Sequence, residues 1–147
     1  QRPELQVVRG RGTNFTYLGF NMQDPVTGRQ AVRQAIAYAL DRQSIIRYVL
    51  DGAARPASAL LPPDHWAGDP ALPQYPYDPA KARALLKAAG YGDGMLRIVY
   101  KTSNDPFRVR LATVIQQQLG AVGIDVDLRS YDWGTFYGDI KAGRIQK

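Results

Sequence analysis

The side chains that could do catalytic chemistry in this sequence are few and widely spaced. Cysteine is absent, which excludes a thiol nucleophile, a thiolate metal site and a disulfide framework. None of the serines lies in a Gly-x-Ser-x-Gly motif, and a serine triad also needs a histidine base. The chain has a single histidine, so catalysis by serine is not expected.

A metal site is not expected either. The one histidine, His65, has only Asp64 and Asp69 as neighbouring acidic residues, and no second histidine is available to complete a ligand set. We interpret His65 as a loop residue that packs beside Trp66. The sequence predicts no bound metal.

A pair of carboxylates two residues apart, Asp125 and Asp127, could serve as a general acid and base. They alternate strictly with Ile124 and Val126, however, as in a strand with one buried face, so their side chains are expected to face solvent. No Walker motif or complete dinucleotide fingerprint is present, and no cofactor is expected. By elimination, the residues indicate a binding or interaction module and not an enzyme.

The second half of the chain predicts a strand, a helix and a second strand. The first strand covers residues 95–101, the helix begins after Asn104-Asp105-Pro106, and the second strand alternates over residues 124–128. Such a unit forms a parallel pair with a right-handed crossover, which places the loop Thr102 to Asp105 at the carboxyl edge, where ligands bind in open α/β sheets. Asp132 caps a last helix that ends at Gly143.

The first half predicts a mostly buried strand over residues 15–22, followed by a turn at Asp24-Pro25. Apolar residues at helical spacing then predict two short helices that meet at Asp41-Arg42, with Ser44 or Asp41 as the cap of the second. A third helix starts at Asp78-Pro79. Between these helices, the stretch 56–79 holds seven of the ten prolines and predicts a packed proline-rich loop.

Composition sets broader limits. With 147 residues, 45% of them hydrophobic, the chain is long enough for one domain with a real core. The net charge of +6 is spread along the chain and forms no basic stripe, so nucleic-acid binding is not expected. The start Gln1-Arg2-Pro3-Glu4 is no signal peptide, and we interpret it as a cut end.

Six runs of residues recur in an order that is hard to obtain by chance. They are Leu18-Gly19-Phe20-Asn21; Val32-Arg33-Gln34-Ala35-Ile36 with Ala39-Leu40-Asp41-Arg42 and Ile45-Ile46; Gly52 to Pro63; Tyr77-Asp78-Pro79-Ala80-Lys81-Ala82 with Leu85-Leu86 and Ala89-Gly90; Ile115-Gln116 with Leu119; and Gly123-Ile124-Asp125-Val126. This pattern resembles extracytoplasmic solute-binding protein family 5, the peptide-, dipeptide- and nickel-binding receptors of bacterial ABC importers.

The resemblance implies an α/β fold, one lobe of a type II periplasmic-binding-protein-like fold with a parallel strand-helix-strand core. Residues 1–147 would form most of a single lobe, and the second lobe, which completes the ligand cleft, would be missing. The implied ligand is a peptide or other small solute, and the implied partner is the membrane permease of an ABC importer. The location would be periplasmic or otherwise extracytoplasmic, with a lipoprotein anchor as one form.

Carried over position by position, the resemblance places five residues at the cleft: Lys101, Thr102, Ser103, Asn104 and Trp133. Two alternatives stay open, because Asn104 could be only a helix cap and Trp133 only a core residue. The rival function is an accessory α/β domain of a larger cytoplasmic enzyme or regulator. Exposed aromatic residues meant for the missing lobe would make the isolated chain self-associate.

Overall fold

A computed structural model describes residues 8, 10, 12, 14–61, 65–69, 71, 72, 74–92, 94 and 96–144. The elements in this part of the chain are, in order, α1 (Gln30–Ala39), α2 (Arg42–Tyr48), α3 (Pro79–Ala88), β1 (Leu96–Ser103), α4 (Pro106–Gly120), β2 (Ile124–Tyr131) and α5 (Trp133–Lys141). The chain divides into two compact units, one formed by Gln1–Leu18 with Ala57–Pro73 and one by Gly19–Pro56 with Gln74–Lys147. All helices and strands named here lie in the second unit.

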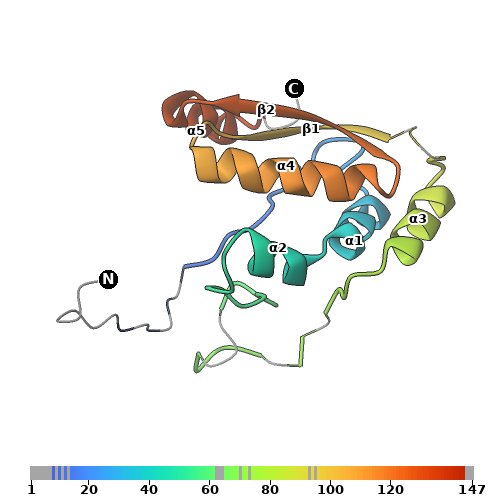
Figure 1. Ribbon diagram of the computed structural model, residues 1–147. Coiled ribbons are helices and arrows are strands. Elements are labelled where there is room, and N and C mark those ends of the chain that lie inside the picture. Colours follow the sequence, from blue (N-terminus) through green and yellow to red (C-terminus); the bar gives the residue numbers. More distant parts are fainter. Residues whose placement is uncertain are drawn as a thin grey trace. The chain divides into compact units, whose positions relative to one another are not determined.

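The centre of the second unit is a parallel pair of strands joined by α4, as the sequence predicts. The pairing runs from Leu96 opposite Ile124 to Ser103 opposite Tyr131. Side chains alternate between the two faces of a strand, and the apolar set on β1 and β2 faces α4, which lies below the strands in Figure 1. The buried residues of this layer are Leu96, Ile98, Leu111, Ala112, Ile115, Leu119, Ile124 and Val126.

Local capping explains where α4 begins. The Asp105 carboxylate accepts a hydrogen bond from the backbone N–H of Arg108 at 3.0 Å, and Pro106 occupies the first turn, where its missing N–H costs nothing. Asp105 is therefore the N-cap. The interpretation of Asn104 as the cap is wrong, because the aspartate is one residue closer to the helix.

The helices α1 and α3 pack together through small and branched apolar residues, and α1 also contacts α4. Their buried residues are Val32, Ala35, Ile36, Ala39, Ala82 and Leu86. The predicted corner between α1 and α2 is present, and Asp41 caps α2 by accepting from the Ser44 N–H at 3.0 Å. Asp78 caps α3 in the same way, from the Lys81 N–H at 2.9 Å.

The prediction of a buried strand over residues 15–22 is wrong. Residues 14–20 belong to no helix or strand, and both Phe15 and Tyr17 are exposed. Aromatic composition favours a strand only where a neighbouring strand pairs with it, and this segment makes no such pair with β1 or β2. The turn that follows is confirmed, because the Asp24 carboxylate accepts from the N–H groups of Val26 and Thr27 at 2.9 and 2.8 Å.

The prediction for the end of β1 needs correction as well. The sequence predicts a strand that ends at Lys101 and a loop from Thr102 to Asp105. Instead β1 continues through Ser103, since Thr102 and Ser103 pair with Ser130 and Tyr131 of β2. The loop at the carboxyl edge is accordingly only Asn104 and Asp105. Met95, the predicted start of the strand, lies outside the described residues.

Within the other unit, the structure describes part of the proline-rich stretch. His65 lies beside Trp66 with ring centroids 5.5 Å apart, which confirms the interpretation of this histidine. Several residues discussed above lie outside the described part of the chain, namely Gln1, Arg2, Pro3, Glu4, Pro62, Pro63 and Asp64.

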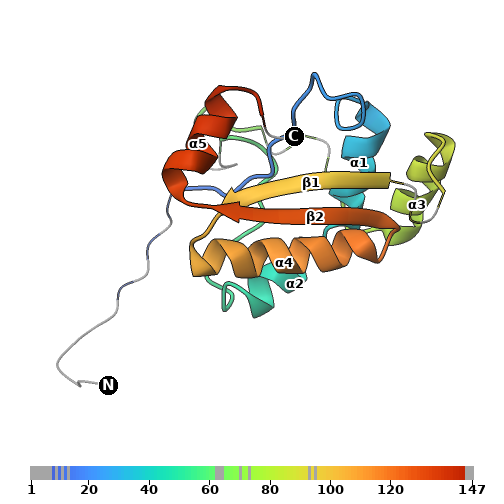
Figure 2. The same ribbon diagram turned by 90° about the horizontal axis from the view of Figure 1, so that it is seen from above.

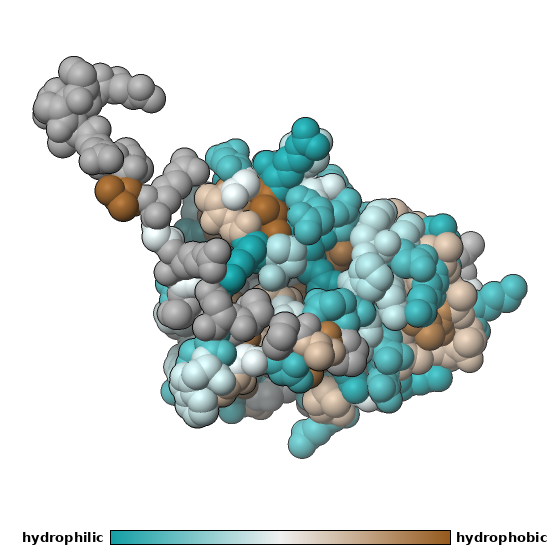
Figure 3. Space-filling model, turned by 90° about the horizontal axis from the view of Figure 1, so that it is seen from below, coloured by the Kyte–Doolittle hydropathy of each residue, from teal (hydrophilic) through white to brown (hydrophobic). Residues whose placement is uncertain are grey.

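On the face drawn in Figure 3, hydrophobic residues are scattered in small patches among hydrophilic ones.

Candidate functional site

The carboxyl ends of β1 and β2 bring two loops together. The backbone N–H of Asn104 donates to the carbonyl of Tyr131 at 2.7 Å, so the residue after β1 is joined to the last residue of β2. One residue later, Asp132 caps α5 by accepting from the N–H of Thr135 at 3.1 Å, and Trp133 begins the helix. Figure 2 shows α5 at the arrowheads of the strands, on the side of β1.

Trp133 is exposed, with 63% of its surface accessible. Its ring stacks on Tyr137 one turn later, with centroids 5.9 Å apart and an interplanar angle of 12°, and it tilts against Phe136 at 5.8 Å. The ammonium of Lys141 lies 5.0 Å from the centre of the Tyr137 ring. The alternative of Trp133 as a core residue is therefore wrong in this structure. An exposed, braced indole can form one wall of a binding surface.

The polar candidates at this edge divide into two groups. Ser103 is partly buried at the end of β1, and Asn104 is exposed beside it. Lys101 and Thr102 are buried inside the strand, at 7% exposure each. The carboxyl edge therefore presents Ser103, Asn104 and Trp133, while Lys101 and Thr102 lie behind them.

Lys101 is engaged by the last turn of α5. Its ammonium donates to the Asp139 carboxylate at 2.6 Å and to the carbonyl of Arg144 at 2.7 Å, and it lies 5.6 Å from the centre of the Tyr131 ring. The hydrogen bond from Lys101, followed by one from Arg144, holds the pKa of Asp139 below its ordinary value of 3.8. Lys101 is thus the centre of an ion-paired cluster rather than an open cation at the edge.

Sequence reasoning missed the partner of Lys101. Asp139 is 38 residues away, in the last turn of a helix, where a carboxylate is ordinarily solvated. Its one sequence signal is position: because α5 follows the strand next to β1, an acidic residue on its inner side can meet a lysine of β1. Nothing in residue spacing alone selects Asp139 over the other carboxylates.

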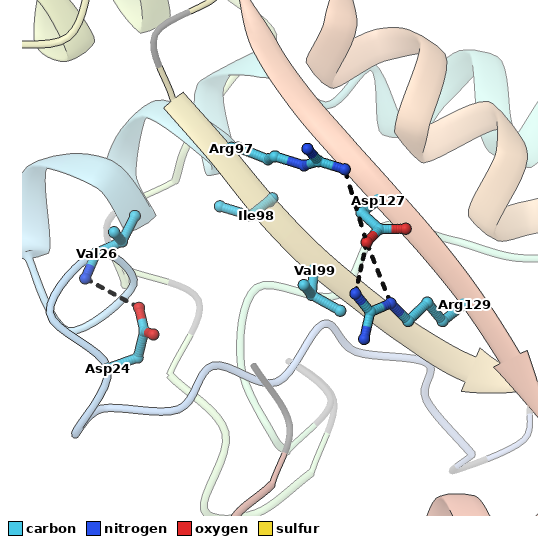
Figure 4. A pocket seen from close by; sticks show the side chains of 7 residues that line it. All are labelled: Asp24, Val26, Arg97, Ile98, Val99, Asp127 and Arg129. Carbon is cyan, nitrogen blue, oxygen red and sulfur yellow. Dashed lines mark hydrogen bonds and ion pairs between the residues drawn. The ribbon is translucent and has the colours of Figure 1, made fainter. Parts of the chain in front are cut away.

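Strands β1 and β2 carry a second charged group, at a hollow of about 420 Å³. Figure 4 shows Arg97 and Arg129 pointing toward Asp127 from the two strands. Arg129 donates to Asp127 at 2.7 and 3.1 Å, and this bond lowers the pKa of Asp127. Arg97 lies 3.5 Å from Asp125. An acid and base pair needs one carboxyl with a raised pKa, and the lowered pKa of Asp127 is the opposite of that requirement.

The described part of the chain contains no group of three or more His, Cys, Asp or Glu side chains that could hold a metal ion. None of the helices described there has the length and hydrophobicity that crossing a bilayer requires. What the described site offers is a surface of backbone, amide, hydroxyl and indole groups, suited to binding.

The fold is an α/β unit built on a parallel pair of strands, and the comparisons with known proteins identify its family. Residues 1–146 match the bacterial extracellular solute-binding proteins, family 5. The chain belongs to this family. It is 33% identical over 148 residues to heme-binding protein A of Haemophilus influenzae, covering 97% of this chain and 27% of that protein.

Two further relatives give the same result. The dipeptide-binding protein of Escherichia coli is 33% identical over 150 residues, covering 99% of this chain and 28% of that protein. The crystal structure of a dipeptide-binding protein from Pseudoalteromonas in complex with Met-Leu superposes with a TM-score of 0.78 at 30% identity, over 86% of this chain and 26% of that one. The chain thus spans little more than a quarter of the length of these relatives.

These matches confirm the family and the fold class that the sequence predicts. The family is that of the bacterial extracellular solute-binding proteins, which favours the receptor interpretation over the rival interpretation as an accessory α/β domain of a larger cytoplasmic enzyme or regulator.

Proposed function

We propose that this chain is part of the substrate-binding component of a bacterial ABC importer, which captures peptides or a related small solute for transport. The observation that carries the proposal is that the residues after β1 and β2 meet at the carboxyl edge of a parallel sheet, where Asn104 bonds to Tyr131, two residues before Trp133, on a family 5 fold. In open α/β sheets this edge is where ligands bind. Binding would rest on Ser103 and Asn104 for polar contacts and on Trp133 for an apolar wall.

The topology supports the same edge. Lys101 lies on the face of β1 opposite the apolar face that α4 covers, and its contact with Asp139 means that α5 reaches the sheet from that opposite face. Crossovers between parallel strands are right-handed. A strand that followed α5 in a longer chain would therefore pair with the other edge of β1, in the order β2, β1, next strand.

This order makes β1 the point at which the sheet changes winding direction. Ligand crevices of open α/β sheets form at such switch points, outside the carboxyl ends of the strands. The loop at the carboxyl end of β1 is Asn104 and Asp105, and Asn104 bonds to Tyr131, two residues before Trp133. The proposed site and the switch point thus coincide.

For the whole protein, we infer that residues 1–147 form most of one lobe of a two-lobed receptor, with the proline-rich loop 56–79 inside it. The partners are the second lobe of the same receptor and the membrane permease of the importer. The receptor would act outside the cytoplasmic membrane, free in the periplasm or held by a lipoprotein anchor. The support is the family description and the small share of the relatives that the chain covers.

The class of solute is a proposal that rests on the relatives and on Trp133. The relatives named above include a heme-binding protein and dipeptide-binding proteins. Heme and dipeptides with apolar side chains both combine an apolar surface with charged groups. The stacked pair of Trp133 and Tyr137 offers an apolar, aromatic surface of the kind that such ligands contact. A dipeptide with apolar side chains fits these groups best.

The test is calorimetric titration of the full-length protein with the dipeptide Met-Leu, a tripeptide, glutathione and hemin. We expect binding of a dipeptide, weakened by Trp133→Ala and by Asn104→Ala. The matched control is Tyr48→Ala, which removes a similarly exposed aromatic residue from α2 and should leave affinity unchanged. Failure of every peptide to bind would reject the peptide proposal, and an unaltered affinity in Trp133→Ala would reject the site.

A further inference from the structure

The helix that carries Trp133 is held in an unusual way. Within the described part of the chain, none of the nine residues of α5 is fully buried, so no core side chain there fixes the position of the helix. The N-terminus of α5 is held in place by its connection to β2, because Asp132 directly follows this strand and caps the helix. Something else must set the rotation of α5 about its axis and the position of its last turn.

The cluster around Lys101 supplies that second attachment. The Lys101 ammonium contacts Asp139 in the last turn of α5 and the carbonyl of Arg144 just beyond it. Only 5% of the Lys101 side chain and 16% of the Asp139 side chain are exposed. Arg144 adds a bond to the second Asp139 oxygen at 3.1 Å, and Asn21 donates to the carbonyl of Gly143 at 3.4 Å.

The geometry of a helix converts this attachment into an orientation of Trp133. Residues of an α-helix follow one another by about 100°, so Asp139, six residues after Trp133, lies about 120° away from it around the axis. Drawing Asp139 inward to β1 therefore turns Trp133 away from the sheet. The exposed indole and its stack on Tyr137 agree with this orientation.

We propose that Lys101 and Asp139 form a positioning pair that sets the orientation of α5 and thereby holds Trp133 in place at the ligand-binding edge. The inference rests on the proposed function, since it assigns Trp133 to the solute. It gives Lys101 a different role from the one carried over by resemblance: the lysine acts on the ligand through α5 and does not touch it.

The other ion pairs of the sheet provide a matched comparison. Arg97 is also a cation of β1 paired to an aspartate, Asp125, but these side chains are 70% and 60% exposed and both belong to the strands. An exposed pair contributes little, and this one ties no separate element to the sheet. Arg97→Gln is therefore the control for Lys101→Met.

The experiment uses the full-length protein labelled with 5-fluorotryptophan, in which the ¹⁹F resonance of Trp133 is assigned by Trp133→Phe. In ligand-free Lys101→Met, we expect this resonance to shift and broaden, because α5 loses its second attachment. Affinity for Met-Leu should fall about 3- to 10-fold, as when one member of a coupled pair is removed. Arg97→Gln should change neither the resonance nor the affinity.

A second variant separates positioning from stability. Lys101→Met leaves the mostly buried Asp139 charge with Arg144 as its one remaining cation among the described residues, which destabilises the fold. Lys101→Met combined with Asp139→Asn removes both charges of the pair and should restore much of the unfolding temperature. If the pair positions Trp133, the double variant keeps the altered resonance and the weaker binding. Recovery of both along with stability would overturn the proposal.

The remaining outcomes distinguish this inference from the proposed function. A normal Trp133 resonance and normal affinity in folded Lys101→Met would overturn the positioning pair. If Trp133→Ala weakens binding while Lys101→Met does not, the site stands and the pair is rejected. If Trp133→Ala leaves affinity for Met-Leu unchanged, or if the parent protein binds no peptide, the proposed binding site is rejected. The role of the Lys101–Asp139 pair in binding is then rejected as well.

Discussion

The backbone N–H of Asn104 donates to the carbonyl of Tyr131 over 2.7 Å, one step beyond the last strand pair of the sheet. This bond extends the ladder past β1 and fixes the backbone of Asn104 next to the residue that leads into α5. The next residue, Asp105, provides the cap of α4. Two adjacent polar residues thus have separate roles, the second structural and the first available to a ligand.

The separation of these roles gives a prediction about stability. Asp105→Ala should lower the free energy of unfolding by about 1 kcal/mol, the usual cost of losing an N-cap. Asn104→Ala should change it by less than about 0.5 kcal/mol, as for an exposed residue outside such features. Urea unfolding of both variants measures the difference. Equal losses in the two variants would contradict the assignment of the cap.

Trp133→Ala should affect binding and leave stability nearly intact. The indole is mostly exposed, so its removal creates no cavity, and the unfolding temperature should stay close to that of the parent. Affinity for the dipeptide should fall by about 1–3 kcal/mol, the usual cost of removing an aromatic contact residue. Calorimetric binding and thermal melting of the same variant provide the test. Its counterpart in the core, Ile36→Ala, should instead cost about 2–5 kcal/mol of stability.

A large melting loss in Trp133→Ala with unchanged affinity would contradict the assignment of Trp133 to the edge of the sheet. A loss of stability as large as that of Ile36→Ala would show that the indole packs inside the fold, whereas Ile36 is only 1% exposed.

The elements of the second unit could be predicted because their signals are local. Asp41, Asp78 and Asp132 precede apolar periodicity and cap helices, as Asp does wherever it can accept from the N–H groups of the first turn. The strict alternation in β2 reflects one face against α4 and one face of ion pairs. The parallel pairing follows from two strands joined by a helix.

The details of the site could not be predicted because they depend on contacts distant in sequence. The extension of β1 to Ser103 comes from pairing with Ser130 and Tyr131. The residue types at positions 102 and 103 do not by themselves predict this pairing. The ion pair of Lys101 with Asp139 joins residues on different elements. The wrong prediction of a strand over residues 15–22 has the same cause. A strand needs a partner strand to pair with, and that partner lies outside the segment's own sequence.

The turn before α1 gives a prediction about Gly28. A Cβ at this position would lie 2.5 Å from the Asp24 carbonyl oxygen and 2.7 Å from that of Met22, both backbone atoms. Gly28→Ala should therefore cost about 1–3 kcal/mol of stability, as overpacked sites do. Gly120→Ala is the matched control, because nothing lies within 4 Å of its Cβ and alanine favours the helix. Both free energies of unfolding are measured in urea, and a lower value for Gly120→Ala than for Gly28→Ala would contradict this description of the turn.

Hydrogen exchange should be slowest in the sheet layer. The amides of β1, α4 and β2 are bonded in regular ladders around buried residues such as Leu96, Leu119 and Ile124, so they open only with the whole unit. Residues 57–61 and 65–69 lie in no helix or strand and should exchange within the first time points. Mass spectrometry of peptic peptides resolves these segments. Early exchange in β2 together with late exchange in residues 57–61 would contradict the assignment of the core.

The last prediction concerns pH. The hydrogen bond from Lys101, and then that from Arg144, lower the pKa of Asp139 below 3.8 in the folded protein. A carboxyl whose folded pKa is depressed stabilises the fold fully above its unfolded pKa, and this contribution is lost as pH falls through the folded value. The stability difference between the parent and Lys101→Met should therefore be constant near neutral pH and shrink below about pH 4. Unfolding temperatures measured from pH 7 to pH 2.5 follow this difference, and carboxyl ¹³C titration of Asp139 should show its pKa raised in Lys101→Met but unchanged in Arg97→Gln. A stability difference that grows on acidification would have the wrong sign for a pair stabilised by the ionised carboxylate.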